Sequence, residues 1–415
     1  MQVMKWSVIA LAVAAGTSQM AVASSQSESN GFVEDSSFNI FNRALYFNRD
    51  FRNAAPGAQS YVEETGLGIR LLFESGFTQG TVGVGVDAHS LSSIKLDSGR
   101  GRHSTGQFGT TGDGRGDDTQ TEVGGAIKFR ISDTVLKYGN QFVDNPVFST
   151  DDSRILPEVG TGTLLTSNEI SGLELTAGRF TALNSQEYTG RDSAGLKEIN
   201  FLGASYSFTD DFSGAVFASD ADDVFKKKYL NLNYNLPLAE DQALNFDFNF
   251  YKTDYDKRTY GESGDNKIWS LAAAYSLGAH RLTLAHQRSS GDAGYDYGYD
   301  GGGAIYLANS VQMRDFNAKD ERSWQARYDL NMATFGIPGL SFMARYVSGS
   351  NIDNGPGSDL NRWERNIEGK YVVQEGAAKD LMFRVRQATY RADDGFEGGK
   401  LDEVRLIVEY PLSVL

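Results

Sequence analysis

The stretch Leu230-Asn231-Leu232-Asn233-Tyr234-Asn235-Leu236 alternates apolar and polar side chains without a break. Leu244-Asn245-Phe246-Asp247-Phe248-Asn249-Phe250 repeats the arrangement, with phenylalanines on its apolar face. A third example is Trp324-Gln325-Ala326-Arg327-Tyr328-Asp329-Leu330-Asn331. Because successive side chains of a β-strand point to opposite faces of a sheet, each stretch predicts a strand with one apolar face and one polar face.

Two kinds of all-β protein fit this alternation. An antiparallel sandwich has a dry core and a wet outside. A transmembrane barrel shows its apolar face to lipid and its polar face to a water-filled lumen. The barrel is favoured because aromatic residues lie near the strand ends, as in interface girdles, and no second apolar sheet is available to cover the Asn, Asp and Arg of the polar face.

Composition supports the same class. Outside the N-terminus no run of 18 apolar residues occurs, which excludes helical membrane spans. Cysteine is absent, so disulfides cannot hold the chain together, whereas a hydrogen-bonded sheet can. The net charge of −15 disfavours a nucleic-acid partner.

The N-terminus predicts export. Lys5 supplies a positive charge, Val8–Ala15 form a short apolar run, and Ala21-Val22-Ala23 before Ser24 fits a cleavage site. We therefore expect a signal peptide at 1–23, a periplasmic segment at 24–37 and a transmembrane barrel domain at 38–415.

An even number of strands is expected, since short periplasmic turns and longer outer loops should alternate. The predicted strands number eighteen and every second link between them is short. They are 38–48, 62–74, 78–91, 120–132, 134–144, 162–168, 172–182, 197–209, 213–220, 225–237, 242–255, 267–278, 279–290, 321–334, 339–348, 363–375, 379–391 and 401–411. Residues 303–314 also resemble a strand, but counting them would break the alternation, so we assign them to a loop.

A lumen of this size is too wide for side chains alone to fill, so an inward loop is needed if the channel is selective. Residues 145–161 and 291–320 are the two candidates, the alternative being ordinary external loops. Their polar residues are the candidate constriction side chains. These are Asp151, Asp152, Arg154, Ser310 and Asp315.

Strand parity predicts which charges face the lumen. Phe383 and Val385 take the lipid face, so Arg384 and Arg386 point inward together. The same reasoning gives a basic ladder along the solute path. Its members are Arg43, Arg70, Arg130, Lys137, Lys370, Arg384, Arg386 and Arg405, with Lys128, Arg327 and Arg345 also inside. Strands between 197 and 255 instead offer an opposite wall of Ser, Asn and Asp.

Guanidinium groups present paired donors that match a carboxylate, and adjacent arginines let an anion pass from one site to the next. The alternative is that the arginines pair with lumen acids such as Glu368, Asp329 and Glu409 and stiffen the wall. Both can hold for different members. We expect passive uptake of small carboxylate-containing solutes such as amino acids and organic acids.

Several stretches resemble the OprD-type (Occ) family of outer-membrane porins. They are Tyr46-Phe47-Asn48-Arg49-Asp50, Lys95-Leu96-Asp97-Ser98-Gly99-Arg100-Gly101-Arg102, Lys137-Tyr138-Gly139, Pro146-Val147-Phe148, Ser323–Leu330, Ala378-Lys379-Asp380-Leu381 and Tyr410-Pro411-Leu412-Ser413. The resemblance implies a monomeric eighteen-stranded barrel in the bacterial outer membrane, among lipid and lipopolysaccharide. It also implies that the third and seventh loops narrow the pore, and that a basic ladder, best matched at Arg43, Arg384 and Arg386, leads a carboxylate through.

Two other classes of barrel protein have requirements that the sequence can be compared with. A barrel hydrolase would need a nucleophile and a base, but no G-x-S-x-G elbow is present, and His280 and His286 fall on the lipid-facing register. A structural or adhesive barrel would conduct nothing. No residue pattern indicates catalysis, a metal or a cofactor, so none is expected.

Overall fold

The computed structural model describes residues 26–415 except 113, 262–263, 297–304, 356–358 and 397–398. The expected signal peptide, 1–23, lies outside the described residues. Among the described residues, no helix is both long and apolar enough to cross a membrane.

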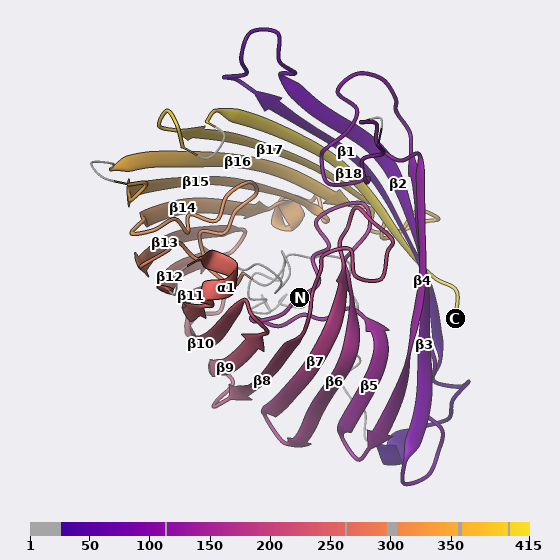
Figure 1. Cartoon of the computed structure of the whole chain (residues 1–415). Coiled ribbons are helices and arrows are strands. Elements are labelled where there is room, and N and C mark those ends of the chain that lie inside the picture. Colours follow the sequence, from indigo (N-terminus) through magenta and orange to yellow (C-terminus); the bar gives the residue numbers. More distant parts are fainter. Residues whose placement is uncertain (1–25, 113, 262–263, 297–304, 356–358, 397–398) are drawn as a thin grey trace.

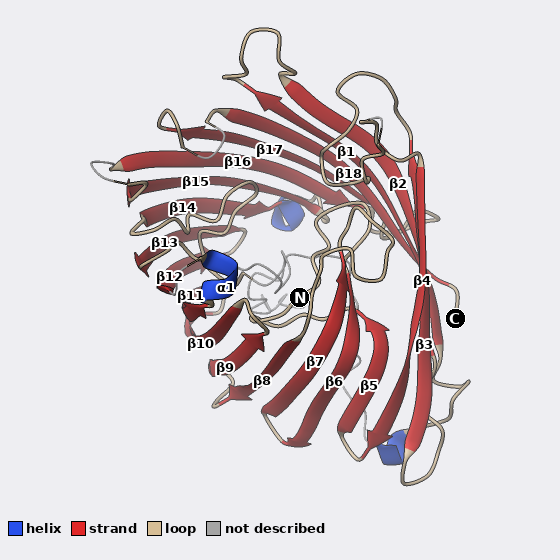
Figure 2. Cartoon of the chain, viewed as in Figure 1, coloured by secondary structure: helices blue, strands red, loops and turns tan. Residues whose placement is uncertain are grey.

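Eighteen antiparallel strands form one closed sheet, because β1 pairs with both β2 and β18. Figure 1 shows the resulting ring, and Figure 2 shows that strands make up nearly all of it. The strands are β1 (Ser37–Phe51), β2 (Tyr61–Glu74), β3 (Gly83–Lys95), β4 (Thr119–Ile131), β5 (Thr134–Gln141), β6 (Val159–Ile170), β7 (Leu173–Asn184), β8 (Ile199–Ser207), β9 (Phe212–Ala221), β10 (Phe225–Ala239), β11 (Gln242–Tyr255), β12 (Gly264–Leu277), β13 (His280–Gly291), β14 (Arg322–Asn331), β15 (Leu340–Ile352), β16 (Leu360–Val372), β17 (Met382–Ala392) and β18 (Leu401–Ser413). The predicted fold class and strand number are thus confirmed.

The third strand was placed too early in the chain. It was expected at 78–91 but runs from Gly83 to Lys95. Residues 78–82 form a turn whose carbonyl groups at Thr78 and Gly80 accept hydrogen bonds from Gln26, at 2.8 and 3.1 Å. These hydrogen bonds from Gln26, more than 50 positions away, replace sheet pairing at 78–82. The alternation of neighbouring residues could not predict them.

Side-chain parity is as predicted. Phe383 and Val385 are 45% and 51% exposed on the outer face, whereas Arg384 and Arg386 between them point into the barrel, with side chains 20% and 18% exposed. His286 lies on the outer face, stacked on Trp324 at 4.3 Å between ring centroids. This is the lipid-facing register that was predicted for His286.

Two long loops fold into the ring instead of away from it (Figure 1). Loop 3 covers residues 142–158 and loop 7 covers residues 292–321, close to the predicted 145–161 and 291–320. Residues 305–314 form no strand, as expected, and residues 303–304 lie outside the described part.

Apolar side chains of these loops build the interior packing. Val147 and Phe148 of loop 3 and Leu307 of loop 7 join a buried cluster with aromatic residues of β7 to β11. Ile155 and Leu156 of loop 3 enter a second cluster against β1 and β3. Because fully burying such a side chain stabilises by about 1.5–3 kcal/mol, this packing stabilises both loops against the inner wall of the barrel.

Candidate functional site

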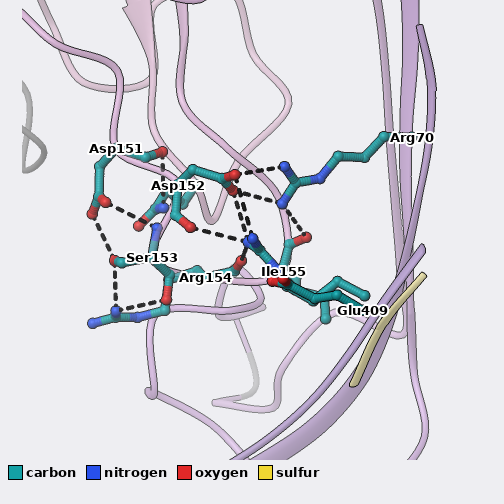
Figure 3. Close-up of polar contacts among 9 residues, drawn as sticks. Arg70, Asp151, Asp152, Ser153, Arg154, Ile155 and Glu409 are labelled. Atoms are coloured by element: carbon teal, nitrogen blue, oxygen red, sulfur yellow. Dashed lines mark hydrogen bonds and ion pairs between the residues drawn. The ribbon is translucent and has the colours of Figure 1, made fainter. Parts of the chain in front are cut away.

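Loop 3 is fixed to the barrel wall by one carboxylate. Asp152 accepts hydrogen bonds from Arg43 Nη1 at 2.7 Å and from Arg70 Nη2 at 2.6 Å, and Arg70 also binds its second oxygen. Arg43 binds Glu409 of β18 at 2.7 Å as well, so the group crosses the seam where the barrel closes. Figure 3 shows Arg70 reaching Asp152 from the wall.

The charges in this cluster lower the pKa of Asp152. Burial by itself would raise the pKa of Asp152, but Arg43 and Arg70 outweigh it and hold the pKa below the ordinary value of 3.8. The carboxylate is therefore ionised throughout the physiological range, and it binds loop 3 to two arginines of β1 and β2.

The other two loop 3 candidates make different contacts. Asp151 binds within the loop, where it accepts from the backbone N–H and the hydroxyl of Ser153 (Figure 3). Arg154 links the loop to the segment between β3 and β4, where it donates to the carbonyl of Thr105 at 3.1 Å. Burial and the neighbouring Arg405 lower the pKa of Arg154 to about 10, so it stays charged at neutral pH.

Loop 7 is docked on the wall formed by β16 and β18. The side chain of Gln312 donates to Glu403 at 3.1 Å, and the backbone N–H of Met313 donates to Glu364 at 3.0 Å. Ser310 and Asp315, the predicted loop 7 candidates, bind each other at 2.6 Å and close a short bend. They therefore shape the loop, while two glutamates hold it.

The two loops touch. Tyr306 Oη of loop 7 donates to Asp144 Oδ1 of loop 3 at 2.6 Å. Burial, followed by the nearby Asp144 carboxylate, raises the pKa of Tyr306, so the phenol remains a donor. This contact makes loops 3 and 7 one structure across the lumen.

Beside the loops, the inward side chains of β14 to β18 form a basic wall. Arg384 and Arg386 share a single acid, Glu368, at 2.7 and 3.2 Å. Arg405 lies directly across from Arg386 in the sheet and pairs with Glu403 at 2.7 Å. Within the described part of the chain, the side chain of Lys370 makes no hydrogen bond or ion pair, and Lys370 lies directly across from Arg384. The three strands β16, β17 and β18 thus bring four predicted ladder residues together.

Other predicted ladder residues lie elsewhere. Lys137 and Lys128 both pair with Asp87, at 2.5 and 2.6 Å, on β3 to β5. Arg130 donates to Gln26 at 2.8 Å and lies over the ring of Phe77, beneath the N-terminal segment. The eight residues form three groups, not one continuous row.

The opposite wall is polar and mostly uncharged, as predicted. Asn231, Asn233 and Asn249 are all hydrogen-bonded to the carboxylate of Asp247, which organises the amides of β10 and β11. One exception is Lys227, which faces inward on β10 but is buried against Tyr295 of loop 7.

Sequence reasoning missed the partners of these groups. It did not identify Asp144, Tyr306, Glu364 or Glu403 as loop anchors, nor Asp87 as the acid between two lysines. Inward parity was the available signal for Asp87, Glu364 and Glu403, because an acid facing a lumen near basic side chains is a pairing candidate. The Tyr306 contact carries no such signal, since both residues lie in loops.

The closed ring and the two inward loops match known proteins along the whole chain. The model of the family described as "outer membrane porin, OprD family" matches residues 30–414. This chain belongs to the OprD family. As members of that family, its relatives are outer-membrane porins that take up particular substrates, and the chain is an outer-membrane transport protein and not a member of an enzyme family.

Individual relatives agree. Porin D of Pseudomonas aeruginosa is 45% identical, and the match covers 100% of both chains. The crystal structure of Acinetobacter baumannii OccAB1 superposes with a TM-score of 0.90 at 33% identity, covering 94% of this chain and 100% of that one. Pseudomonas aeruginosa OpdK, solved with vanillate, gives a TM-score of 0.84 at 33% identity, with coverages of 92% and 100%.

Proposed function

We propose that this porin passes small carboxylate-bearing solutes, such as amino acids and organic acids, passively across the outer membrane as a monomer. The solute is oriented between loops 3 and 7 and then moves along Arg386, Arg384 and Lys370 toward the periplasm. The vanillate in the related OpdK structure is itself a carboxylate, which supports this solute class.

The observation that carries the proposal is the imbalance of charge on the basic wall. Glu368 serves two arginines, and Lys370 beside them has no acid bonded to it among the described residues. Both guanidinium groups keep part of their surface open to the lumen, unlike those of Arg43 and Arg70, whose side chains are 5% and 6% exposed. Unneutralised, accessible donors attract a carboxylate.

The residues of the predicted basic ladder therefore have two different roles in this proposal. Arg43 and Arg70 hold loop 3 through Asp152 and shape the constriction. Arg384, Arg386 and Lys370 meet the solute, whereas Arg405, whose side chain is 5% exposed, pairs with Glu403 and binds loop 7 at the Gln312 carbonyl. The Asn-rich opposite wall supports this division, because a basic wall facing neutral amides creates a transverse field that orients a charged solute.

Uptake into liposomes tests the proposal. R384Q/R386Q should lower uptake of labelled carboxylates by about tenfold or more, as expected for losing one charge-assisted hydrogen bond of 1.5–3 kcal/mol, while leakage of an uncharged sugar changes little. Equal loss of both solutes would count against the proposal.

The variant E368Q is the matched control, because it changes the same cluster but leaves both arginines free of their acid. Carboxylate uptake through E368Q should equal or exceed that of the unmodified porin. A fall as large as that in R384Q/R386Q would show that the cluster serves only to keep the wall intact. A panel of carboxylates in the same assay would identify the preferred solute.

A further inference from the structure

Two arginines face each other on the outside of the barrel. Arg288 of β13 and Arg322 of β14 are direct partners in the sheet register. Their chain neighbours Gln287, Ser289 and Ser323 are fully buried toward the interior, whereas both arginines are exposed. Alternation therefore turns the two guanidinium groups to the lipid-facing side.

The pair lies at the extracellular end of its strands. Arg322 is the first residue of β14, directly after loop 7, and Arg288 lies three residues before β13 ends at that loop. The neighbouring strands β12, β13 and β14 lie side by side in the ring (Figure 1). Trp269 of β12 lies directly across from Arg288, and it packs on the same face with His286 and Trp324, which lie two residues closer to the middle of their strands. Aromatic girdles of this kind mark the boundary between hydrocarbon and headgroups.

The pair also lacks a counterion. In the part of the chain that the structure describes, neither Arg288 nor Arg322 makes an ion pair, whereas other outward-facing cations do. Arg179 pairs with Glu198 at 2.7 Å and Lys226 with Asp220 at 3.0 Å. Like charges directly opposite each other in a sheet repel, so an anion from outside the chain would relieve the contact.

More positive charge continues from the pair around the outer face. Lys228, Lys252 and Lys267 are successive register partners on β10, β11 and β12. Lys252 and Lys267 pair with Asp254 and Asp265, at 3.3 and 3.2 Å. Among the described residues, the arginine pair is thus an end of this basic stripe where two cations lie side by side with no acid bonded to them.

We propose that Arg288 and Arg322 bind a phosphate group of lipopolysaccharide in the outer leaflet. The acyl chains would lie on the apolar face of β12 to β14, and the phosphate would bridge the two guanidinium groups. Arginine matches phosphate oxygens with paired donors, and the boundary position places it at headgroup depth. This inference is independent of which solute the channel carries.

Native mass spectrometry of the purified porin with bisphosphorylated lipid A tests the proposal. R288Q/R322Q should retain the lipid at least about tenfold more weakly than the unmodified porin, because two charge-assisted contacts are lost. R288K/R322K should recover part of the binding. Lipid A stripped of its phosphates should bind the unmodified porin and R288Q/R322Q equally weakly.

The double variant R179Q/K226Q is the matched control, since it removes two outward-facing cations that already have acid partners. It should retain lipid A like the unmodified porin. Equal retention by R288Q/R322Q and the unmodified porin, or equal loss in both double variants, would overturn the proposal. Heat-dependent migration in gels verifies that each barrel is folded.

Discussion

At the scale of single residues, Asp152 is the group on which loop 3 depends most. D152N leaves Arg43 and Arg70 buried without their shared carboxylate, which should destabilise the protein by about 3–5 kcal/mol. Single-channel recording should show a larger and noisier conductance as loop 3 detaches. D151N is the control, because the Asp151 carboxylate hydrogen-bonds Ser153 of the same loop, and it should leave the conductance close to that of the unmodified porin.

Asp152 also determines the pH below which loop 3 should lose this stabilisation. Because the pKa of Asp152 in the folded protein lies below 3.8, the clamp contributes stability above that pH and loses it as the pH falls through the lower folded value. Channel noise in the unmodified porin should therefore stay constant from pH 7 to about 4 and rise only below it. D152N should show no such acid step, and a step centred near neutral pH would contradict the assignment.

At the scale of elements, loops 3 and 7 are joined by the hydrogen bond between Tyr306 and Asp144, and we propose that together they form the constriction. Y306F removes a hydrogen bond to a charged acceptor, worth about 1.5–3 kcal/mol, and should let the loops move apart. Current traces should then show more frequent switching between conductance levels. Y275F removes a hydroxyl that binds Gln242 on β11, away from the loops, and should leave the switching rate unchanged.

Across the whole molecule, the proposed attraction of solutes by the basic wall is electrostatic and should depend on salt. The Debye length falls from about 10 Å at 0.1 M to about 3 Å at 1 M ionic strength. The apparent affinity of a carboxylate, measured from its block of the ionic current, should therefore drop as salt rises. A neutral solute of similar size supplies the comparison, and an equal drop for both would point to a steric effect.

Much of this molecule follows from short-range pattern. Alternation at 230–236 and 244–250 identified strands whose bounds are nearly those observed, and parity at Phe383 and Val385 turned Arg384 and Arg386 inward correctly. The alternation of a strand depends only on neighbouring residues. Because a charged side chain at mid-depth in the lipid is costly, it is strongly favoured to point toward the lumen. The loops could be located as well, because they are the segments between the strands that the alternation identifies.

Contacts between segments that are distant in the sequence could not be predicted from the alternation of side chains. Parity predicted that Arg43 and Arg70 face the lumen, but it did not identify their partner Asp152, which lies 109 and 82 positions away. Gln26 is a second example. It hydrogen-bonds the Thr78 carbonyl before the start of β3, and it accepts a hydrogen bond from Arg130. Which acid neutralises which arginine depends on closing the ring and folding the loops back into it, because only then do the charges meet.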